Sequence, residues 1–527
     1  MKLNSLHIHD FFTKELPADP IEQGKERQVK GSCFSYIDPT VPAKPSVVHI
    51  ADEVADLIGL NKEDMGSEDF IKIFSGAEVM NGTKPFAMCY GGHQFGNWAG
   101  QLGDGRAINL AEVEHEGKHW ALQLKGAGKT PYSRGADGLA VLRSSIREHL
   151  CSEAMYHLGV PTSRSLSLML TGNRVLRDVM YDGNADMEAG AIVCRVAESF
   201  IRFGSFEILV SNQDLDALKS LADFTIQHHF PEIKETGKDA YGAMFKAVCQ
   251  RSLDMVIHWQ RVGFVHGVMN TDNMSILGHT IDYGPYGWLE GYDNHWTPNT
   301  TDSQNKRYRY GKQPEMVFWN LHKLANALYP LVKDAAPFEE GMNEYNNSFL
   351  VKYRDMRLSK LGIAEYQEGD DDLIQEVEKL LQLTETDMTL FYRNLAQYEA
   401  GFKLDEDNAF FDIFLESLYV PTEFTGETQF RWRIWFENYD ERLQKETCTN
   451  EERKLLMNKV NPKYVLRNYM AQLAIDAADK GDFKLVEELY DMLKNPYAEQ
   501  EENEKWFAKR PDWARHKVGC SMLSCSS

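Results

Sequence analysis

Two side chains near the middle of the chain have the chemistry and spacing of a metal–phosphate site. They lie in the stretch His266–Gly284, HGVMNTDNMSILGHTIDYG, where Asn273 follows seven residues after His266 and Asp282 follows an apolar-rich run. An amide oxygen and a carboxylate are hard ligands that suit Mg²⁺ or Mn²⁺, and such a cation neutralises nucleotide phosphates. The spacing therefore predicts Asn273 and Asp282 as ligands of Mg²⁺ beside nucleotide phosphates.

The same skeleton occurs in the catalytic loop of protein kinases, H-R-D-x-x-x-x-N followed by D-F-G. Where a kinase has its catalytic Asp, this chain has Val268, which cannot accept a proton. The nearest spare carboxylate is Asp272. The loop is expected to hold a metal–nucleotide complex without ordinary kinase chemistry. A polar loop between two short strands is the alternative, because Asp-Tyr-Gly-Pro is also a turn sequence.

A glycine-rich stretch upstream could bring backbone amides close to phosphates. Its specific part is the turn Gly103-Asp104-Gly105-Arg106, which carries a guanidinium at its exit. Glycine lets the backbone approach a phosphate because no Cβ intervenes. The stretch is neither a Walker A loop nor a G-x-G-x-x-G motif, so a plain glycine-rich hairpin is the alternative.

A hairpin and a helix are predicted to position a lysine and a glutamate. Alternating strands cover 106–113 and 119–125, with a turn at Glu116-Gly117. Lys125 ends the second strand on the face opposite its bulky apolar residues. A helix is predicted over 139–157, and Glu148 lies off its apolar stripe. A Lys125–Glu148 ion pair is the arrangement of a kinase; solvent-facing positions for both are the alternative.

Further charged residues could meet phosphates. Arg134, Asp137 and Gly138 precede the predicted helix, where anions are favoured. Arg195 and Arg202 lie seven residues apart in an apolar setting, on opposite faces of a strand or on one face of a helix. Phosphates would satisfy these two arginines. Buried carboxylates, for example Glu198 or Glu207, would serve equally.

Composition limits the function classes. The chain has 527 residues and a formal charge of −22, which argues against a protein that coats nucleic acid. It shows no membrane-spanning run and no targeting segment, and its eight cysteines do not form a disulfide framework or a zinc pattern. We therefore expect a cytoplasmic protein with no nucleic-acid and no membrane partner. The pattern is mainly helical from about Leu215 to Gly263 and from Gln313 to the end.

Together these parts resemble the selenoprotein O family, pseudokinases with many bacterial cysteine-containing members. The resemblance covers nearly the whole chain. It is carried by GGHQFGNWAGQLGDGR, LQLKGAGKTPYSRGADGLAVLRSSIRE, RVAESFIRFGSFE, GFVHGVMNTDNMSILGHTIDYGPYG, NPKYVLRNYMAQ and the terminal CSS. It implies an α+β, protein-kinase-like bilobal fold with an N-terminal extension (1–80), an N-lobe (81–210), a C-lobe (211–440) and a C-terminal helical region with a Cys-containing tail (441–527).

The resemblance also implies a function. ATP would bind in a flipped orientation, and AMP would be transferred to Ser, Thr or Tyr hydroxyls of other proteins, with UMP transfer as a further option. Asp272 would be the general base, Asn273 and Asp282 would hold the metal, and Glu148 would support Lys125. The other residues implied to contact the nucleotide are Gly103, Gly105, Arg106, Lys125, Asp137, Gly138, Arg195 and Arg202. The alternatives are a phosphotransferase that uses the γ-phosphate and a non-catalytic ATP-binding scaffold.

Cys525 falls where some relatives carry selenocysteine, so the resemblance implies a redox role for the tail. Many relatives have a cysteine after D-Y-G, in a C-N-x-[ST]-D pattern, whereas this chain has Pro298 there. A disulfide from the tail to this segment is therefore not expected. Cys520 is an alternative partner, and a free thiol is the simplest state for Cys525.

Overall fold

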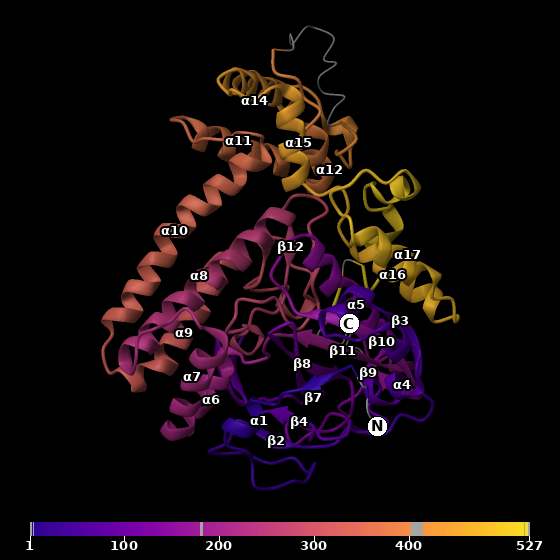
Figure 1. Ribbon diagram of the computed structural model, residues 1–527. Helices are drawn as coiled ribbons and strands as arrows, with labels where there is room; N and C mark the ends of the chain where they lie inside the picture. The colour runs from indigo at the N-terminus through magenta and orange to yellow at the C-terminus, as the bar shows by residue number, and fades with distance from the viewer. Residues whose placement is uncertain (1–2, 4, 180–182, 402–414, 521, 525–527) are drawn as a thin grey trace.

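The computed structural model describes residues 3, 5–179, 183–401, 415–520 and 522–524. It combines an antiparallel sheet from residues 7–197 with helices that form most of the rest of the chain (Figure 1). The predicted α+β class and helical C-terminal region are confirmed. No helix in the described ranges is long and apolar enough to cross a membrane. Cys525 lies outside the described residues.

The main sheet has the strand order β2-β4-β7-β8-β11-β10-β3, with β1 paired to β7 and β9 paired to β11. Strands from the first 80 residues therefore form both of its edges. The strands are β1 (His7–Ile8), β2 (Phe34–Tyr36), β3 (Ser46–Ile50), β4 (Phe86–Met88), β7 (Ala107–His115), β8 (Lys118–Lys125), β9 (Ala140–Val141), β10 (Arg164–Arg177) and β11 (Asp186–Ala197). Two short pairs lie apart from this sheet: β5 (Gly91–Gln94) with β6 (Asn97–Gln101), and β12 (Phe264–Val265) with β13 (Gly287–Trp288).

The hairpin β7–β8 confirms the strands predicted from alternation. Glu116 and Gly117 form its turn at φ angles of 51° and 74°, the left-handed pair that a two-residue hairpin loop needs. The register pairs Ala107 with Lys125, so the lysine ends β8 at the mouth of the glycine-rich turn. On its other side β8 pairs with β11, which brings Gln123 opposite Arg195.

The helix predicted over 139–157 is α5 (Leu142–His157), which begins later than expected. Ala140 and Val141 instead form the short strand β9, because they pair with Ala191 and Gly190 of β11. The helix is buried along most of its length, between β10 and β11 on one side and α16 and α17 on the other. Glu148, off the predicted apolar stripe, consequently faces the sheet.

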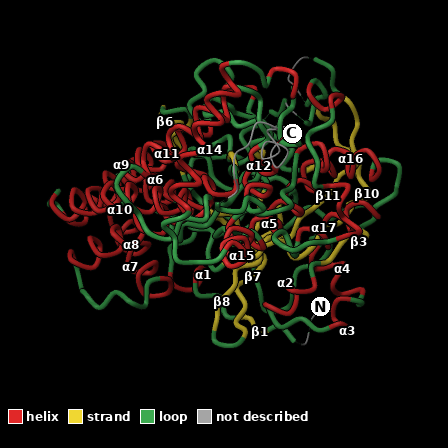
Figure 2. Tube along the Cα trace, turned by 90° about the horizontal axis from the view of Figure 1, so that it is seen from above, coloured by secondary structure: helices red, strands yellow, loops and turns green. Residues whose placement is uncertain are grey.

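The helices gather on two sides of the sheet. Figure 2 places α8, α9 and α10 on one side of the molecule, and α16 and α17 beside β3 and β10 on the other. The first-half helices are α1 (Phe12–Glu15), α2 (Asp52–Leu57), α3 (Lys62–Met65), α4 (Glu68–Phe74), α6 (Phe203–Ser211), α7 (Leu215–His229) and α8 (Lys238–Val262). The later ones are α9 (Gln313–Val332), α10 (Ala336–Lys360), α11 (Asp370–Leu383), α12 (Met388–Leu395), α14 (Glu427–Leu443), α15 (Asn450–Val460), α16 (Asn468–Ala478) and α17 (Lys484–Leu493).

Two hydrophobic cores hold these layers together. The larger joins the sheet to α5, α8, α9 and α16. The smaller lies among α11, α12 and α14, where Trp432, Trp435 and Phe436 are fully buried. The segment from β12 to β13 contributes to both cores. The loop with the predicted metal ligands is thus anchored between the sheet and the helices.

Candidate active site

The loop from His266 to Asn273 is held in place by the side chain of its first residue, His266. Gly263, at φ +75°, ends α8, and β12 then leads to His266. The His266 ring donates from Nε2 to the Ile281 carbonyl at 2.9 Å, and its Nδ1 accepts from the Val268 amide at 3.3 Å. Burial lowers the pKa of His266, which fits this neutral tautomer. The histidine therefore ties the loop to the residue before Asp282.

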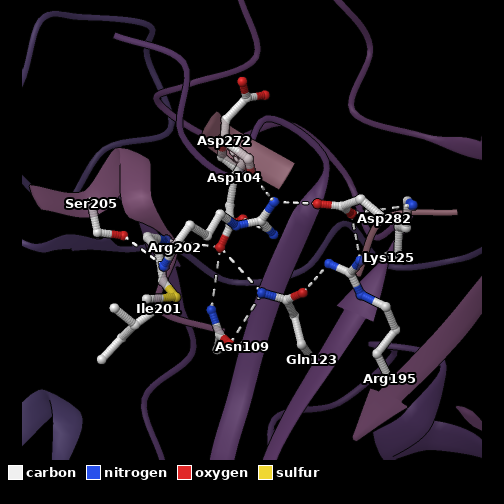
Figure 3. A network of polar contacts seen from close by, with 12 residues as sticks. Asp104, Asn109, Gln123, Lys125, Arg195, Ile201, Arg202, Ser205, Asp272 and Asp282 are labelled. Atoms are coloured by element: carbon white, nitrogen blue, oxygen red, sulfur yellow. Dashed lines mark hydrogen bonds and ion pairs between the residues drawn. The ribbon is translucent and has the colours of Figure 1, made fainter. Parts of the chain in front are cut away.

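Asp282 is the centre of a cationic cluster (Figure 3). It is a non-glycine residue at φ +60°, in the left-handed region. Its carboxylate lies 2.6 Å from Arg195 and 3.5 Å from Lys125, and it also accepts a hydrogen bond from Arg202. Burial alone would raise the pKa of Asp282, but Arg202, Arg195 and Lys125 together lower it well below the usual value. Asp282 is therefore a permanent anion next to three cations.

The predicted pair of Lys125 and Glu148 is present, at 2.7 Å. Both side chains are buried, and Glu148 also lies 3.3 Å from Arg195. Burial lowers the pKa of Lys125, while Glu148 and Asp282 oppose that shift. The alternative that both residues face solvent is thus wrong. Strand β8 and helix α5 instead contribute to one cluster of charged side chains.

Arg195 and Arg202 meet although neither predicted geometry applies. Arg195 lies in β11, whereas Arg202 precedes α6 after a turn, so no single strand or helix relates them. Their carboxylate partners in the site are Asp282 and Glu148 for Arg195, and Asp282 and Asp104 for Arg202. The suggested carboxylate Glu207 instead accepts a hydrogen bond from His93.

The glycine-rich turn requires its glycines for space as well as conformation. A Cβ on Gly103, at φ +72°, would lie 2.3 Å from the Tyr132 ring, and one on Gly105 would lie 2.8 Å from the Tyr132 carbonyl oxygen. Arg106 is exposed at the exit of the turn, whereas Asp104 points into the protein and is 1% exposed. The turn thus separates an exposed cation from a buried anion.

Asp137 and Gly138 line the same cavity as the glycine-rich turn. Asp137 forms a double hydrogen bond with Arg177 at 2.7 and 2.8 Å. Burial would raise the pKa of Asp137, but the hydrogen bonds from Arg177 and from the Leu139 amide lower it overall. A Cβ on Gly138 would lie 2.1 Å from the Gly128 carbonyl, so only glycine fits at this position.

Arg202 donates to the Asp272 main-chain carbonyl at 2.8 Å, but in Figure 3 the Asp272 carboxylate points away from Asp282. Gln94 donates to one carboxylate oxygen at 3.2 Å, and the other oxygen is buried without a partner among the described residues. Burial raises the pKa of Asp272 to about 6, against the hydrogen bond from Gln94 and the charge of Arg202. Such a carboxylate is ionised at neutral pH yet basic enough to take a proton.

Asn273 is held so that its amide oxygen can act as a ligand. Its Nδ2 donates to the Val268 carbonyl at 2.9 Å, which leaves the amide oxygen Oδ1 available to bind a metal ion. Asn273 and Asp282 line one cavity. The described residues contain no group of three or more His, Cys, Asp or Glu that could hold a metal alone. An amide oxygen, a carboxylate and nucleotide phosphate oxygens together would suit Mg²⁺ or Mn²⁺.

All the predicted nucleotide-contacting and metal-binding residues line one cavity of about 590 Å³, as does Asp272. Lys125 and Arg195 reach it from the sheet, and Arg202 from the start of α6. Sequence reasoning missed several of its residues: Tyr90, Gln94, Phe95, Asp104, Tyr132 and Arg177. Behind the cavity, Gln123 supports two of its lining residues: it donates to Asp104 at 3.2 Å and accepts a hydrogen bond from Arg195. The alternation that placed Lys125 puts Gln123 on the same strand face.

The described cysteines are free thiols, and five of them are buried in the cores: Cys33, Cys89, Cys151, Cys194 and Cys249. Cys520 is buried too, and burial raises the pKa of its thiol to about 11. Because Cys525 lies outside the described residues, its redox role and its pairing with Cys520 stay predictions.

Comparison with known proteins shows the family of this chain. The family model described as "Protein adenylyltransferase SelO" matches residues 25–494. Proteins named "Protein nucleotidyltransferase YdiU" from Flavobacterium johnsoniae and Rhodopirellula baltica are 58% and 55% identical to the chain. The first alignment covers 100% of both chains and the second 98% of both. A third protein of that name, from Azoarcus sp., is 52% identical over 98% of each chain. The chain belongs to the SelO family of protein adenylyltransferases.

Proposed function

We propose that this protein transfers AMP from ATP to Ser, Thr or Tyr hydroxyls of other proteins, and that the cavity around Asp282 is its active site. Membership in a protein adenylyltransferase family supports the activity. The observation that carries the site is the convergence of Lys125, Arg195 and Arg202 on Asp282, in a cavity that the buried Asp272 also lines. The order of the elements, with the sheet before the catalytic loop and helices after it, also supports a protein-kinase-like bilobal fold. The boundaries at residues 80, 210 and 440 stay predictions, because β1, β2 and β3 from the first 80 residues join the main sheet and residues 210 and 440 lie within α6 and α14.

The cations would bind and neutralise the phosphates. Lys125, Arg195 and Arg202 offer N–H donors at the base of the cavity, and Arg106 offers another at its rim. Charge-assisted hydrogen bonds to phosphate are the strong kind, and they act best from side chains already held in place. The other proposed nucleotide contacts, Gly103, Gly105, Asp137 and Gly138, line the walls of the cavity.

Asp272 would act as the general base. It takes the proton of the acceptor hydroxyl, whose oxygen forms a bond to the α-phosphorus of ATP. The bond from the α-phosphorus to the bridging oxygen breaks, and pyrophosphate leaves with its electron pair. Asn273 and Asp282 would hold Mg²⁺ or Mn²⁺, which supplies charge neutralisation for the phosphates. With ATP reversed relative to a kinase, Val268 need not take part.

Isotope-labelled ATP tests this proposal. The protein is incubated with Mg²⁺ or Mn²⁺, a protein extract as acceptor, and ATP labelled on the α- or the γ-phosphate. We expect protein-bound label from the α position only, and its loss in Asp272→Asn with ATP binding retained. Label from the γ position alone would establish a phosphotransferase instead. ATP binding without label from either position would establish a scaffold.

A further inference from the structure

The hairpin β5–β6 lies directly against the catalytic loop and is separate from the main sheet. Gln94, at its turn, holds the carboxylate of Asp272. The His93 amide donates to the Thr271 hydroxyl at 2.7 Å, which fixes β5 against the residue before Asp272. Both Gln94 and Phe95 line the cavity. The hairpin therefore forms the wall next to the proposed base.

Strand β6 presents an open edge beside that wall. Within the described part of the chain, β6 pairs only with β5, and α6 covers the other side of β5, where a Cβ on Gly204 would meet the Gly91 carbonyl at 2.1 Å. Asn97, Trp98 and Ala99 are exposed. An open strand edge offers backbone N–H and C=O groups to another extended chain.

A segment with three cations, Lys306, Arg307 and Arg309, reaches the hairpin through Arg307. Lys306, Arg307 and Arg309 form no ion pair with any described residue, although the chain carries a net charge of −22. Arg307 reaches the hairpin turn: its guanidinium carbon would lie 3.4 Å from a Cβ on Gly96, and it stacks 4.6 Å over the Trp319 ring. Its Nε is buried and has no hydrogen-bond partner among the described residues. This surface is a basic spot on an acidic protein.

We propose that the open edge of β6, together with Lys306, Arg307 and Arg309, binds an extended acidic segment of the protein acceptor and presents its hydroxyl to Asp272. The inference rests on the proposed function and adds the acceptor's chemistry to it. An extended segment fits because a strand edge pairs with another strand. Acidic side chains fit because the three cations form no ion pair among the described residues. Asp302 is near Arg307 and Arg309, but its carboxylate already accepts hydrogen bonds from the Arg307 and Tyr308 backbone amides.

The first test compares two peptides of about twelve residues, enough to span an ordinary strand. Each carries Ser-Thr-Tyr at its centre, flanked by Glu in one peptide and by Gln in the other, and transfer is measured with α-labelled ATP. We expect kcat/KM to be about tenfold higher for the Glu peptide at low salt. The advantage should shrink near 1 M salt, where the screening length is about 3 Å. N-methylation of alternate residues of the Glu peptide should lower its transfer.

The second test uses variants with a matched control. Arg307→Gln combined with Arg309→Glu should remove the preference for the Glu peptide and leave transfer to the Gln peptide and the Kd for ATP unchanged. Lys459→Glu, an exposed change on the distant helix α15, should leave the preference intact. A melting curve of each variant checks that it folds.

Two outcomes would overturn the docking surface while leaving the proposed function in place. One is equal transfer to both peptides. The other is label in proteins of an extract but in neither peptide, because the surface as proposed accepts a short extended segment. Absence of α-label in every acceptor, extract included, would instead refute the proposed function itself.

Discussion

A double-mutant cycle on Lys125 and Glu148 tests the charge cluster directly. Lys125→Met removes the ammonium and keeps the length of the side chain, and Glu148→Gln removes the charge and keeps the shape. The two groups lie 2.7 Å apart and are 9% and 5% exposed. At an effective dielectric constant of about 20, unit charges at the measured 2.7 Å attract by about 6 kcal/mol, although the cost of burying them offsets most of this.

Removing one partner of a buried pair costs about 3–5 kcal/mol, because the other charge stays buried. For Glu148→Gln we expect the lower end, since Asp282 remains 3.5 Å from Lys125. With about 2.1 cal/mol/K of unfolding entropy per residue, 527 residues give about 1.1 kcal/mol/K, so about 3 kcal/mol lowers Tm by about 3 °C. The double variant should lose only about 3–4 kcal/mol, a coupling of about 2–3 kcal/mol.

Thermal melts of the four proteins and ATP titrations provide the assay. Lys125→Met should raise the Kd for ATP by about ten- to hundredfold, because a hydrogen bond to a charged group contributes about 1.5–3 kcal/mol to the free energy of binding. The double variant should bind ATP somewhat more weakly than Lys125→Met alone, because Glu148 also holds Arg195 at 3.3 Å. Additive losses of stability, within about 0.5 kcal/mol, would refute the coupling of this pair.

Three other changes test separate parts of the structure. Asp272→Asn should lower the rate of AMP transfer by about 10²–10⁴-fold and leave the Kd for ATP unchanged. In the wild-type protein, kcat/KM should fall as pH drops below about 6, because Asp272 becomes protonated there. A rate that does not depend on pH would contradict the role of Asp272 as the base. Gly103→Ala should destabilise the protein by about 2–3 kcal/mol, whereas Gly100→Ala, at a similar positive φ with no atom within 4 Å, should cost less in the same melts. Burial raises the pKa of Glu112 from 4.5 to about 7, so the folded protein loses stability as pH rises through about 7 and this side chain becomes charged. Glu112→Gln cannot become charged and should therefore raise Tm by about 2 °C at pH 8, after a discount for partial exposure. At pH 4, where Glu112 is protonated in the folded protein, the same variant should leave Tm unchanged.

Local periodicity was enough to predict the parts of the site that lie within one element. The alternation of β8 placed Lys125 on the correct face, and the helical stripe of α5 turned Glu148 toward it. The start of α5 was wrong because pairing with β11 holds Ala140 and Val141 in extended conformation, which is a tertiary effect. No local pattern reports such a pairing.

Contacts between distant segments could not be predicted in the same way. Arg195 and Arg202 converge because a turn separates a strand from a helix, and the geometry of that turn is not encoded in their spacing. The pair Asp137–Arg177 joins residues 40 positions apart. Gln94 is a similar case, because its contact with Asp272 depends on how the hairpin β5–β6 packs against the catalytic loop.

The cluster around Asp282 raises a question of charge balance. Asp282 pairs with Lys125, Arg195 and Arg202. In the proposed complex the same carboxylate holds a metal ion, and the three cations face phosphates instead. This exchange would be costly if it left buried cations without carboxylate partners before the phosphates arrive, since an unpaired buried charge costs several kcal/mol.

The structure avoids that cost because each cation has a second carboxylate. Lys125 and Arg195 share Glu148, at 2.7 and 3.3 Å, and Arg202 lies 3.7 Å from Asp104. Both carboxylates are buried, and neither is a proposed metal ligand, so they could keep their partners if Asp282 held a metal. Glu148 and Asp104 therefore keep the cations in place for the incoming phosphates. Of the two, Glu148 should matter more for ATP affinity. It holds two cations, Lys125 and Arg195, whereas Asp104 holds only Arg202 and at a longer distance.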